Sequence, residues 1–160
     1  MEELATGFGL VEGPTWINDT GLLFSDVIKG GVYLLDHLNN VLPIVEHRRG
    51  IGGIAIHQEN GLIVGGRNIA YKSFTGDKTT ILLSNDVTEV ALGFNDLTTD
   101  SKGRVYVGSV AFKVFSDDEM IPGHLHLIDV DGSVRTISDG VMLTNGLGFS
   151  PDGRTLYHAD

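Results

Sequence analysis

The sequence lacks cysteine and has no long apolar run, and only four of its 160 residues are proline. Without cysteine the fold cannot depend on disulfides, which is typical of proteins that stay in a reducing compartment. No segment is long and apolar enough to span a membrane, and the N-terminal residues MEELATGFGL lack the basic region of a signal peptide. We therefore predict a cytoplasmic protein with no membrane partner.

Positive charge is also scarce. Eleven Lys and Arg residues stand against 21 Asp and Glu residues, which gives a formal net charge of −10 at pH 7. The phosphates of nucleic acids and the headgroups of anionic lipids repel such a chain, so we predict neither as a partner. An acidic surface is compatible with cation binding, although surplus carboxylates are far more often just a solvated surface.

Glycine, in contrast, is abundant, and 22 glycines with four prolines suit a turn-dense all-β chain. Residues 145–160 (NGLGFSPDGRTLYHAD) read as two alternating runs joined by a tight turn that ends in Gly153. The pattern recurs upstream with its turn glycine at Gly21, Gly61 and Gly103, at intervals of 40, 42 and 50 residues. Two more strand-like runs follow each of these upstream hairpins. Four strands per repeat at this period predict a β-propeller.

We predict one partial propeller domain over residues 1–160, with about three blades and the first hairpin of a fourth. The expected blades cover residues 12–47, 52–84, 95–138 and, incompletely, 145–160. Residues 111–123 (AFKVFSDDEMIPG) form an insertion in the third blade, which is either a functional lid or a mobile surface loop. Because each propeller blade packs on two neighbours, we expect a fragment of a longer protein, a truncated product or a half-propeller that associates with itself.

The residue before the first strand of each repeat is Glu12, Gly52, Asn95 or Asn145. The first strand of a propeller blade lines the central channel, so these residues should converge on the axis at one end of it. Three of the four carry side-chain oxygens, which a hard cation such as Ca²⁺ takes as ligands. Each residue alone is more simply explained by the conformation of its turn. Three at equivalent positions predict a metal site made of Glu12, Asn95 and Asn145.

Three phrases of the chain, in this order, resemble the senescence-marker-protein/gluconolactonase/luciferin-regenerating-enzyme family of six-bladed propellers. They are VEGPTW (11–16), FNDLTTDSKGRVYVGS (94–109) and NGLGFSPDGRTLY (145–157). The resemblance covers nearly the whole chain. It implies a metal-dependent hydrolase of the lactonase type, acting on a small lactone or ester, with this chain as its N-terminal half.

The resemblance also implies roles for individual residues. Glu12 and Asn145 would bind the catalytic metal, and Asn95 would contact the metal or the substrate. The cation, Ca²⁺ first with Zn²⁺, Mn²⁺ and Mg²⁺ as alternatives, would act as a Lewis acid on the carbonyl or phosphoryl oxygen. The family's remaining ligand, an Asp that acts as general base or nucleophile, would lie beyond Asp160. The catalytic residue is therefore unknown, and we expect this chain to be inactive alone.

One departure from the family concerns the substrate. Lactonases of the family often place an arginine two residues before the equivalent of Asn95 to hold sugar hydroxyls, and that position is Gly93 here. Arg67, or Arg48 and Arg49, could reach the channel mouth instead, and we take Arg67 as the candidate, with Asn95 as the second substrate-binding residue. A sugar-acid lactone is therefore less firmly implied than the fold. The alternative from another class is a non-catalytic propeller that serves as a binding module or scaffold.

Several other residues receive simpler interpretations. His124 and His126 share one face of a predicted strand without a third metal partner, so we interpret them as an exposed strand face. Strand alternation should turn Asp96 away from Asn95. Five aromatic residues recur at blade-equivalent places and are expected to fill the core between blades: Trp16, Phe24, Tyr106, Phe149 and Tyr157.

Overall fold

The computed structural model describes residues 2–75 and 78–160, and almost all of its regular structure is antiparallel β-sheet. Three sheets have four strands each, and a fourth sheet has two. The 3-10 turn η1 (Asn85–Val87) is the one helical element within these residues. No helix of the described residues is long and apolar enough to cross a membrane. The predicted all-β class is confirmed.

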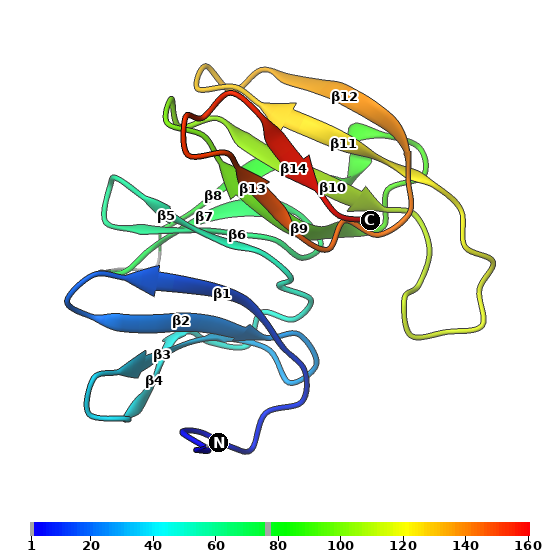
Figure 1. Cartoon of the computed structure of the whole chain (residues 1–160). Helices are drawn as coiled ribbons and strands as arrows, with labels where there is room; N and C mark the ends of the chain where they lie inside the picture. The colour runs from blue at the N-terminus through cyan, green and yellow to red at the C-terminus, as the bar shows by residue number, and fades with distance from the viewer. Residues whose placement is uncertain (1, 76–77) are drawn as a thin grey trace.

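Each four-stranded sheet is a meander, because strands that follow one another in the chain pair with one another. The first sheet consists of β1 (Val11–Ile17), β2 (Gly21–Asp26), β3 (Val32–Asp36) and β4 (Val41–Val45). The second consists of β5 (Ile54–His57), β6 (Gly61–Val64), β7 (Ile69–Ser73) and β8 (Thr79–Leu83). The third consists of β9 (Gly93–Thr99), β10 (Val105–Val110), β11 (Gly123–Ile128) and β12 (Val134–Val141). The two-stranded sheet consists of β13 (Leu147–Phe149) and β14 (Leu156–His158) (Figure 1).

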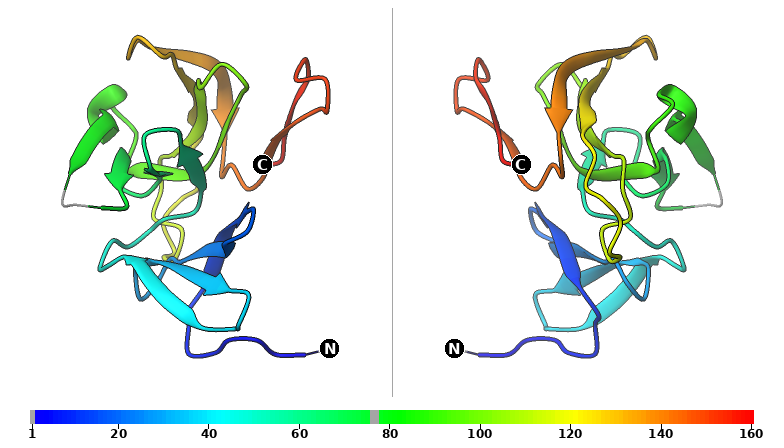
Figure 2. Two further views of the ribbon diagram at one scale, coloured as in Figure 1. Left: turned by 90° about the vertical axis from the view of Figure 1, so that its left-hand side faces the viewer. Right: turned by 90° about the vertical axis from the view of Figure 1, so that its right-hand side faces the viewer.

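The four sheets lie in an arc around a common centre (Figure 2). Their first strands are the innermost: β1 contacts β5, β5 contacts β9, and β9 contacts β13. The remaining strands of each four-stranded sheet follow outward in chain order. This is the architecture of a β-propeller, and it places the start of each repeat beside the axis.

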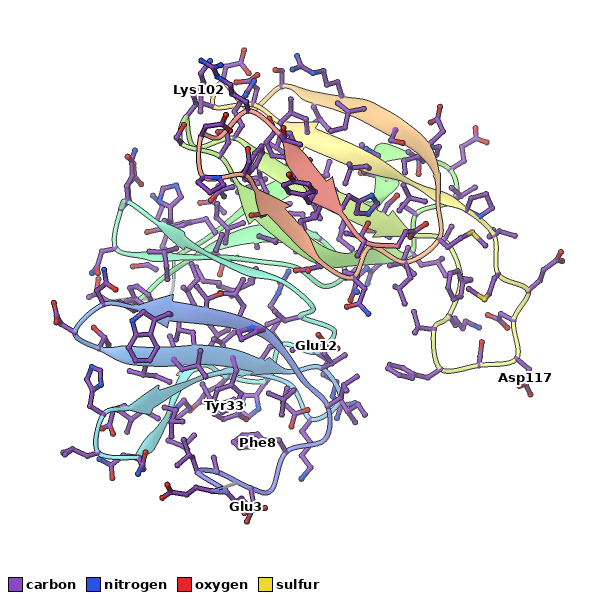
Figure 3. All side chains as sticks on the ribbon, viewed as in Figure 1. Glu3, Phe8, Glu12, Tyr33, Lys102 and Asp117 are labelled. Carbon is purple, nitrogen blue, oxygen red and sulfur yellow. The ribbon has the colours of Figure 1, made fainter. Side chains whose placement is uncertain are left out.

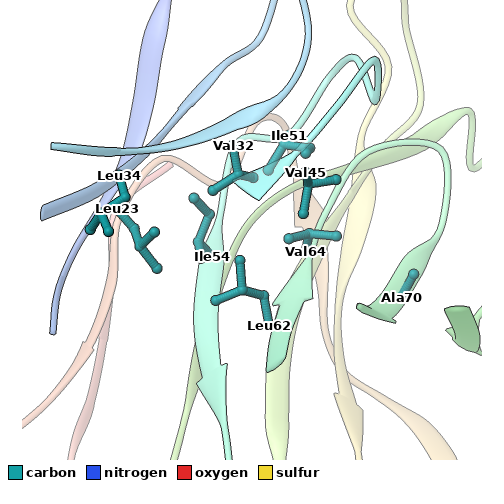
Figure 4. Close-up of a cluster of buried hydrophobic side chains, with 9 residues drawn as sticks. All are labelled: Leu23, Val32, Leu34, Val45, Ile51, Ile54, Leu62, Val64 and Ala70. Atoms are coloured by element: carbon teal, nitrogen blue, oxygen red, sulfur yellow. The ribbon is translucent and has the colours of Figure 1, made fainter. Parts of the chain in front are cut away.

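The core fills the space between neighbouring sheets. One cluster joins the first two sheets and includes Leu23, Val32, Ile54, Leu62 and Val64 (Figure 4). A second cluster joins the second and third sheets and includes Ile63, from the same strand β6. Successive residues of a strand point to opposite faces, so the apolar run of β6 serves both clusters. Each such side chain contributes about 1.5–3 kcal/mol when it is fully buried.

The expected aromatic core is only partly present. Phe24 and Tyr106 are buried, and the ring of Phe149 packs on that of Tyr106 with 5.1 Å between centroids. Trp16 and Tyr157 are 58% and 65% exposed, so their assignment to the core was wrong. Trp16 borders the channel, and Tyr157 lies on β14, which pairs with β13 alone among the described strands.

The interpretation of the two histidines of β11 was also wrong. His126 is fully buried, and His124 is half-buried. The ring nitrogens of His126 lie 3.1 Å from Ser109 Oγ and 3.4 Å from Thr136 Oγ1. An imidazole can be buried at this place because both nitrogens have hydrogen-bond partners on the flanking strands.

Candidate functional site

A cavity of about 760 Å³ opens at one end of the central channel. Glu12, Asn95 and Asn145 all border it, and so does Arg67. Glu12 is the second residue of β1, Asn95 lies in β9, and Asn145 precedes β13. Arg67 lies between β6 and β7 of the second sheet. The structure therefore brings together, from all four repeats, the four residues that the sequence singled out.

A second cavity, of about 710 Å³, continues along the channel. Glu12 and Asn145 border it as well, so these two residues lie where the two cavities meet. Asp96 lines only the second cavity, together with Trp16 and Leu147. Glu12 and Asn145 are thus reached from both cavities, whereas Asn95 is reached from the first.

A β-bulge positions Asn95 and Asp96. In the pairing of β9 with β10, these two residues together lie opposite the single residue Gly108. Asn95 borders the first cavity, whereas Asp96 borders the second. Asp96 was not predicted to lie near Glu12, because simple alternation along a strand does not include the bulge.

The carboxamide of Asn95 has a fixed orientation. Its Nδ2 donates a hydrogen bond of 2.8 Å to the carbonyl oxygen of Thr144, which leaves Oδ1 as the free acceptor. A Cβ atom at Gly52 would overlap this Oδ1. Gly52 occupies the equivalent position in the second repeat, and its lack of a side chain leaves room for the Asn95 carboxamide.

The backbone that leads to Glu12 is held by a buried carboxylate. Asp26, at the end of β2, accepts hydrogen bonds from the backbone N–H groups of Gly9 at 2.7 Å and Leu10 at 3.4 Å. Burial alone would raise the pKa of Asp26, but these bonds and two more from the backbone that follows hold it below its usual value. Asp26 thereby fixes Gly9 and Leu10, which lie three and two residues before Glu12.

The same arrangement recurs in the fourth repeat. Asp160 accepts hydrogen bonds from the backbone N–H groups of Met142 at 3.0 Å and Leu143 at 2.7 Å. These residues lie three and two positions before Asn145, and the N–H of Asn145 donates to the carbonyl oxygen of Ala159 at 2.9 Å. Two repeats therefore hold their channel residue with the same carboxylate contact.

The electrostatics of the site favour a cation. Burial, and secondly the negative charge of Asp96, raise the pKa of Glu12. Burial also raises the pKa of Asp96, although backbone hydrogen bonds from Leu97 and Gly146 oppose this. Two neighbouring carboxylates whose ionised forms are disfavoured would both gain from a nearby positive charge.

The donor set consists of hard oxygen atoms. No group of three or more His, Cys, Asp and Glu side chains is placed to hold a metal within residues 2–75 and 78–160. A metal at this site would therefore depend on the amide oxygens of Asn95 and Asn145 besides the carboxylate of Glu12. Carboxylate and amide oxygens fit Ca²⁺, which accepts both.

One long loop borders the first cavity. The segment 111–123 leaves β10 and returns at β11, and residues 112–116 line the cavity. It projects from the molecule with Asp117 near its tip (Figure 3). Arg67 and Lys113 supply the cationic groups of the lining.

These features define a class of protein: a β-propeller whose channel carries convergent oxygen donors at one end. The chain belongs to the SMP-30/gluconolactonase/LRE-like family, because residues 10–160 match the model of that family. The resemblance inferred from the three phrases is therefore confirmed.

Two curated relatives are enzymes that are named for lactones. The chain is 27% identical over 157 residues to the pentonolactonase XacC of Haloferax volcanii, with 97% of this chain and 51% of the relative covered. It is 26% identical over 153 residues to a 6-deoxy-6-sulfogluconolactonase of Pseudomonas putida, with 94% and 51% covered. The chain thus spans about half the length of the curated relatives it matches.

Solved structures show the same fold. A gluconolactonase of Xanthomonas campestris matches with a TM-score of 0.82 at 22% identity, over 98% of this chain and 56% of the other. The regucalcin of Agrobacterium tumefaciens, described as a calcium-binding protein, matches with a TM-score of 0.79 at 18% identity, over 98% and 52%. At these identities the likeness concerns the fold alone.

Proposed function

We propose that this chain carries the cation site of a metal-dependent lactonase, which opens a lactone ring with water. The observation that carries the proposal is the meeting of Glu12, Asn95 and Asn145, from three sheets, at one cavity. The relatives named as lactonases support the substrate class. The carboxylate and amide oxygens of these residues support Ca²⁺ as the cation, because Ca²⁺ accepts both kinds of ligand.

Each residue has a distinct task in this proposal. Glu12 provides the carboxylate ligand, and Asn95 and Asn145 provide amide oxygens, with Asn95 oriented by its bond to Thr144. A bound divalent cation would supply a Lewis acid for the lactone carbonyl oxygen. Arg67, exposed at the rim of the same cavity, attracts the negative charge that develops as the ring opens to a hydroxy acid.

The remaining proposals concern the whole protein. Because the chain spans about half of its lactonase relatives, we propose that it acts as the N-terminal half of the enzyme. We also propose that this enzyme is cytoplasmic. By itself it binds the cation without turnover, since the general base or nucleophile of the resemblance lies outside it. Association with a second half would complete the site.

Calcium titration by calorimetry tests the site. Glu12→Gln and Asn145→Ala should each weaken Ca²⁺ binding at least about tenfold, which corresponds to about 1.4 kcal/mol. Glu59→Gln, at an exposed residue after β5, makes the same chemical change as the Glu12 variant and should leave the affinity unchanged. Unchanged Ca²⁺ affinity in both site variants would refute the proposal.

A non-catalytic binding module is the second candidate function. The exposed aromatic side chains of Trp16, Phe115 and Tyr157 favour it, because such residues are typical of partner-binding faces. This candidate predicts no Ca²⁺ binding that depends on Glu12 or Asn145. The same titration therefore discriminates between the two functions.

A further inference from the structure

The first cavity is unusual for a site that would bind sugars, because most of its lining is apolar. Besides the three donor residues, its polar side chains are Arg67, Lys113 and Ser116. Three buried apolar residues, Phe94, Val110 and Phe112, form part of the wall. Apolar side chains thus make up more of the lining than polar ones.

Part of this apolar surface faces solvent. Leu92 is 51% exposed, Val114 is 41% exposed and Phe115 is 72% exposed, and all three line the cavity. Val114 and Phe115 lie on the loop 111–123 and line the same cavity as Glu12. A ligand that covers these side chains removes apolar area from water, which is favourable.

The backbone on one side of the cavity leaves little room for an added side chain at Gly93. Gly93 and Gly66 both line the cavity, and Phe94 forms an antiparallel bridge with Gly66. A Cβ atom at Gly93 would lie 3.0 Å from the carbonyl oxygen of Gly66, which already accepts the N–H of Phe94. Hydroxyl groups of a ligand at this wall would therefore meet no side-chain hydrogen-bond partner from position 93.

We infer that the site takes lactones with an apolar substituent, such as an alkyl chain or an aryl ring, in preference to polyhydroxylated sugar lactones. This inference rests on the proposed function, and it places the ring carbonyl at Glu12, Asn95 and Asn145. The substituent lies along Phe112, Val114 and Phe115. A polyol in the same place loses hydrogen bonds to water that the apolar wall does not replace.

Lactams test the ligand class without chemistry, because they have the shape of lactones but resist hydrolysis. Calorimetry of the full chain with Ca²⁺ would compare piperidin-2-one, its 6-propyl and 6-pentyl derivatives, and gluconolactam. Affinity should rise about threefold to fourfold with each added methylene until the cavity is filled. The pentyl lactam should bind at least about tenfold more tightly than gluconolactam.

A pair of variants locates the effect. Phe115→Ser should reduce the affinity for the pentyl lactam about tenfold and leave that for piperidin-2-one nearly unchanged. Leu38→Ser removes an equally exposed apolar side chain in the turn between β3 and β4 and should change neither affinity. Both side chains are largely exposed, so both variants should fold.

The outcomes separate this inference from the proposed function. The inference is overturned if gluconolactam binds as tightly as the pentyl lactam or more tightly, or if neither ligand binds. The proposed function survives either result as long as Ca²⁺ binding depends on Glu12 and Asn145. Loss of the alkyl preference in Phe115→Ser alone supports it. If Ca²⁺ binding does not depend on Glu12 and Asn145, the proposed function itself fails.

Discussion

At the scale of the residue, His126 on β11 has a strongly lowered pKa. It is fully buried between Ser109 on β10 and Thr136 on β12. His124 lies on the same face, with its ring centroid 5.8 Å away, and pairs with Asp139 at 2.9 Å. Burial, and secondly the charge of His124, lower the pKa of His126 to about 4.

This pKa predicts a pH-dependent stability. In the unfolded chain the pKa is near 6.5, so between pH 6.5 and 4 the unfolded state binds more protons than the folded state. The free energy of unfolding should therefore fall as the pH drops through this range, by up to about 3 kcal/mol. Urea unfolding measured from pH 7.5 to 4.5 would show the slope.

Two variants assign the slope to His126. His126→Gln cannot take up the proton, so its stability should depend less on pH than that of the wild type, even if it is lower at pH 7. His37→Gln removes an exposed histidine and should keep the wild-type slope. A His126→Gln variant with the wild-type slope would show that other groups cause the loss of stability in acid.

The sequence predicted some residue positions well, for a physical reason. Glu12, Asn95 and Asn145 hold equivalent places in a repeat, and equivalent places in a propeller lie at the same height on one axis. Their meeting follows from this register, whereas their role as metal ligands stays a prediction. The position of Asp96 beside Glu12 depends on a β-bulge, in which Asn95 and Asp96 lie opposite Gly108 of β10. Alternation along one strand does not predict such a bulge, because it takes no account of the paired strand.

At the scale of the element, the repeated carboxylate contact connects strand ends to the site. Asp26 ends β2 and binds the segment before Glu12, and Asp160 follows β14 and binds the segment before Asn145. Both segments are loops, whose backbone N–H groups would otherwise be free to move. We expect these two carboxylates to position Glu12 and Asn145 without touching the cation.

Replacement of each Asp by Asn tests this positioning role. Asp160→Asn should weaken Ca²⁺ binding about threefold to tenfold, because an amide accepts hydrogen bonds less strongly than a carboxylate. Asp26→Asn should weaken it as well and should also lower the thermal midpoint, since its carboxylate is fully buried. Calorimetry and thermal unfolding measure the two effects separately.

The matched control is Asp152→Asn. This carboxylate also accepts hydrogen bonds, from Ser150 Oγ and the N–H of Arg154, but it lies in the turn between β13 and β14. It should leave Ca²⁺ affinity unchanged. Equal loss of affinity in all three variants would mean that general destabilisation, and not positioning, links these carboxylates to the site.

Hairpins were the elements easiest to predict, because alternation and turn glycines are local features. The turn at Asp131 and Gly132 does join β11 to β12, and the hairpin that contains Gly153 does join β13 to β14. The contact of Asp26 with Gly9 joins residues 17 positions apart. No local pattern contains such a contact, so it became visible only in three dimensions.

At the scale of the whole molecule, the repeat alone was enough to predict a propeller. Four-stranded units at this period are typical of propeller blades, which cover each other's faces around an axis. The exposure of Trp16 on β1 and Tyr157 on β14 was not predictable in the same way. A repeat indicates equivalent positions, but it does not say which of them a neighbouring sheet covers.

Self-association is the prediction that belongs to this scale. Tyr157 is exposed, and within the described residues β14 has a strand partner on one side only. An exposed apolar side chain beside an unpaired strand edge favours pairing with a second copy. Sedimentation velocity should therefore show reversible association that increases with protein concentration.

A charge on that edge should prevent the association. Tyr157→Lys places a cation beside the free backbone groups of β14, and lysine on an edge strand opposes pairing. Val130→Lys introduces the same charge at an exposed apolar residue in the β11–β12 turn and should leave the association unchanged. A wild-type chain that stays monomeric at all concentrations, or a Tyr157→Lys variant that associates like the wild type, would contradict a contact through this edge.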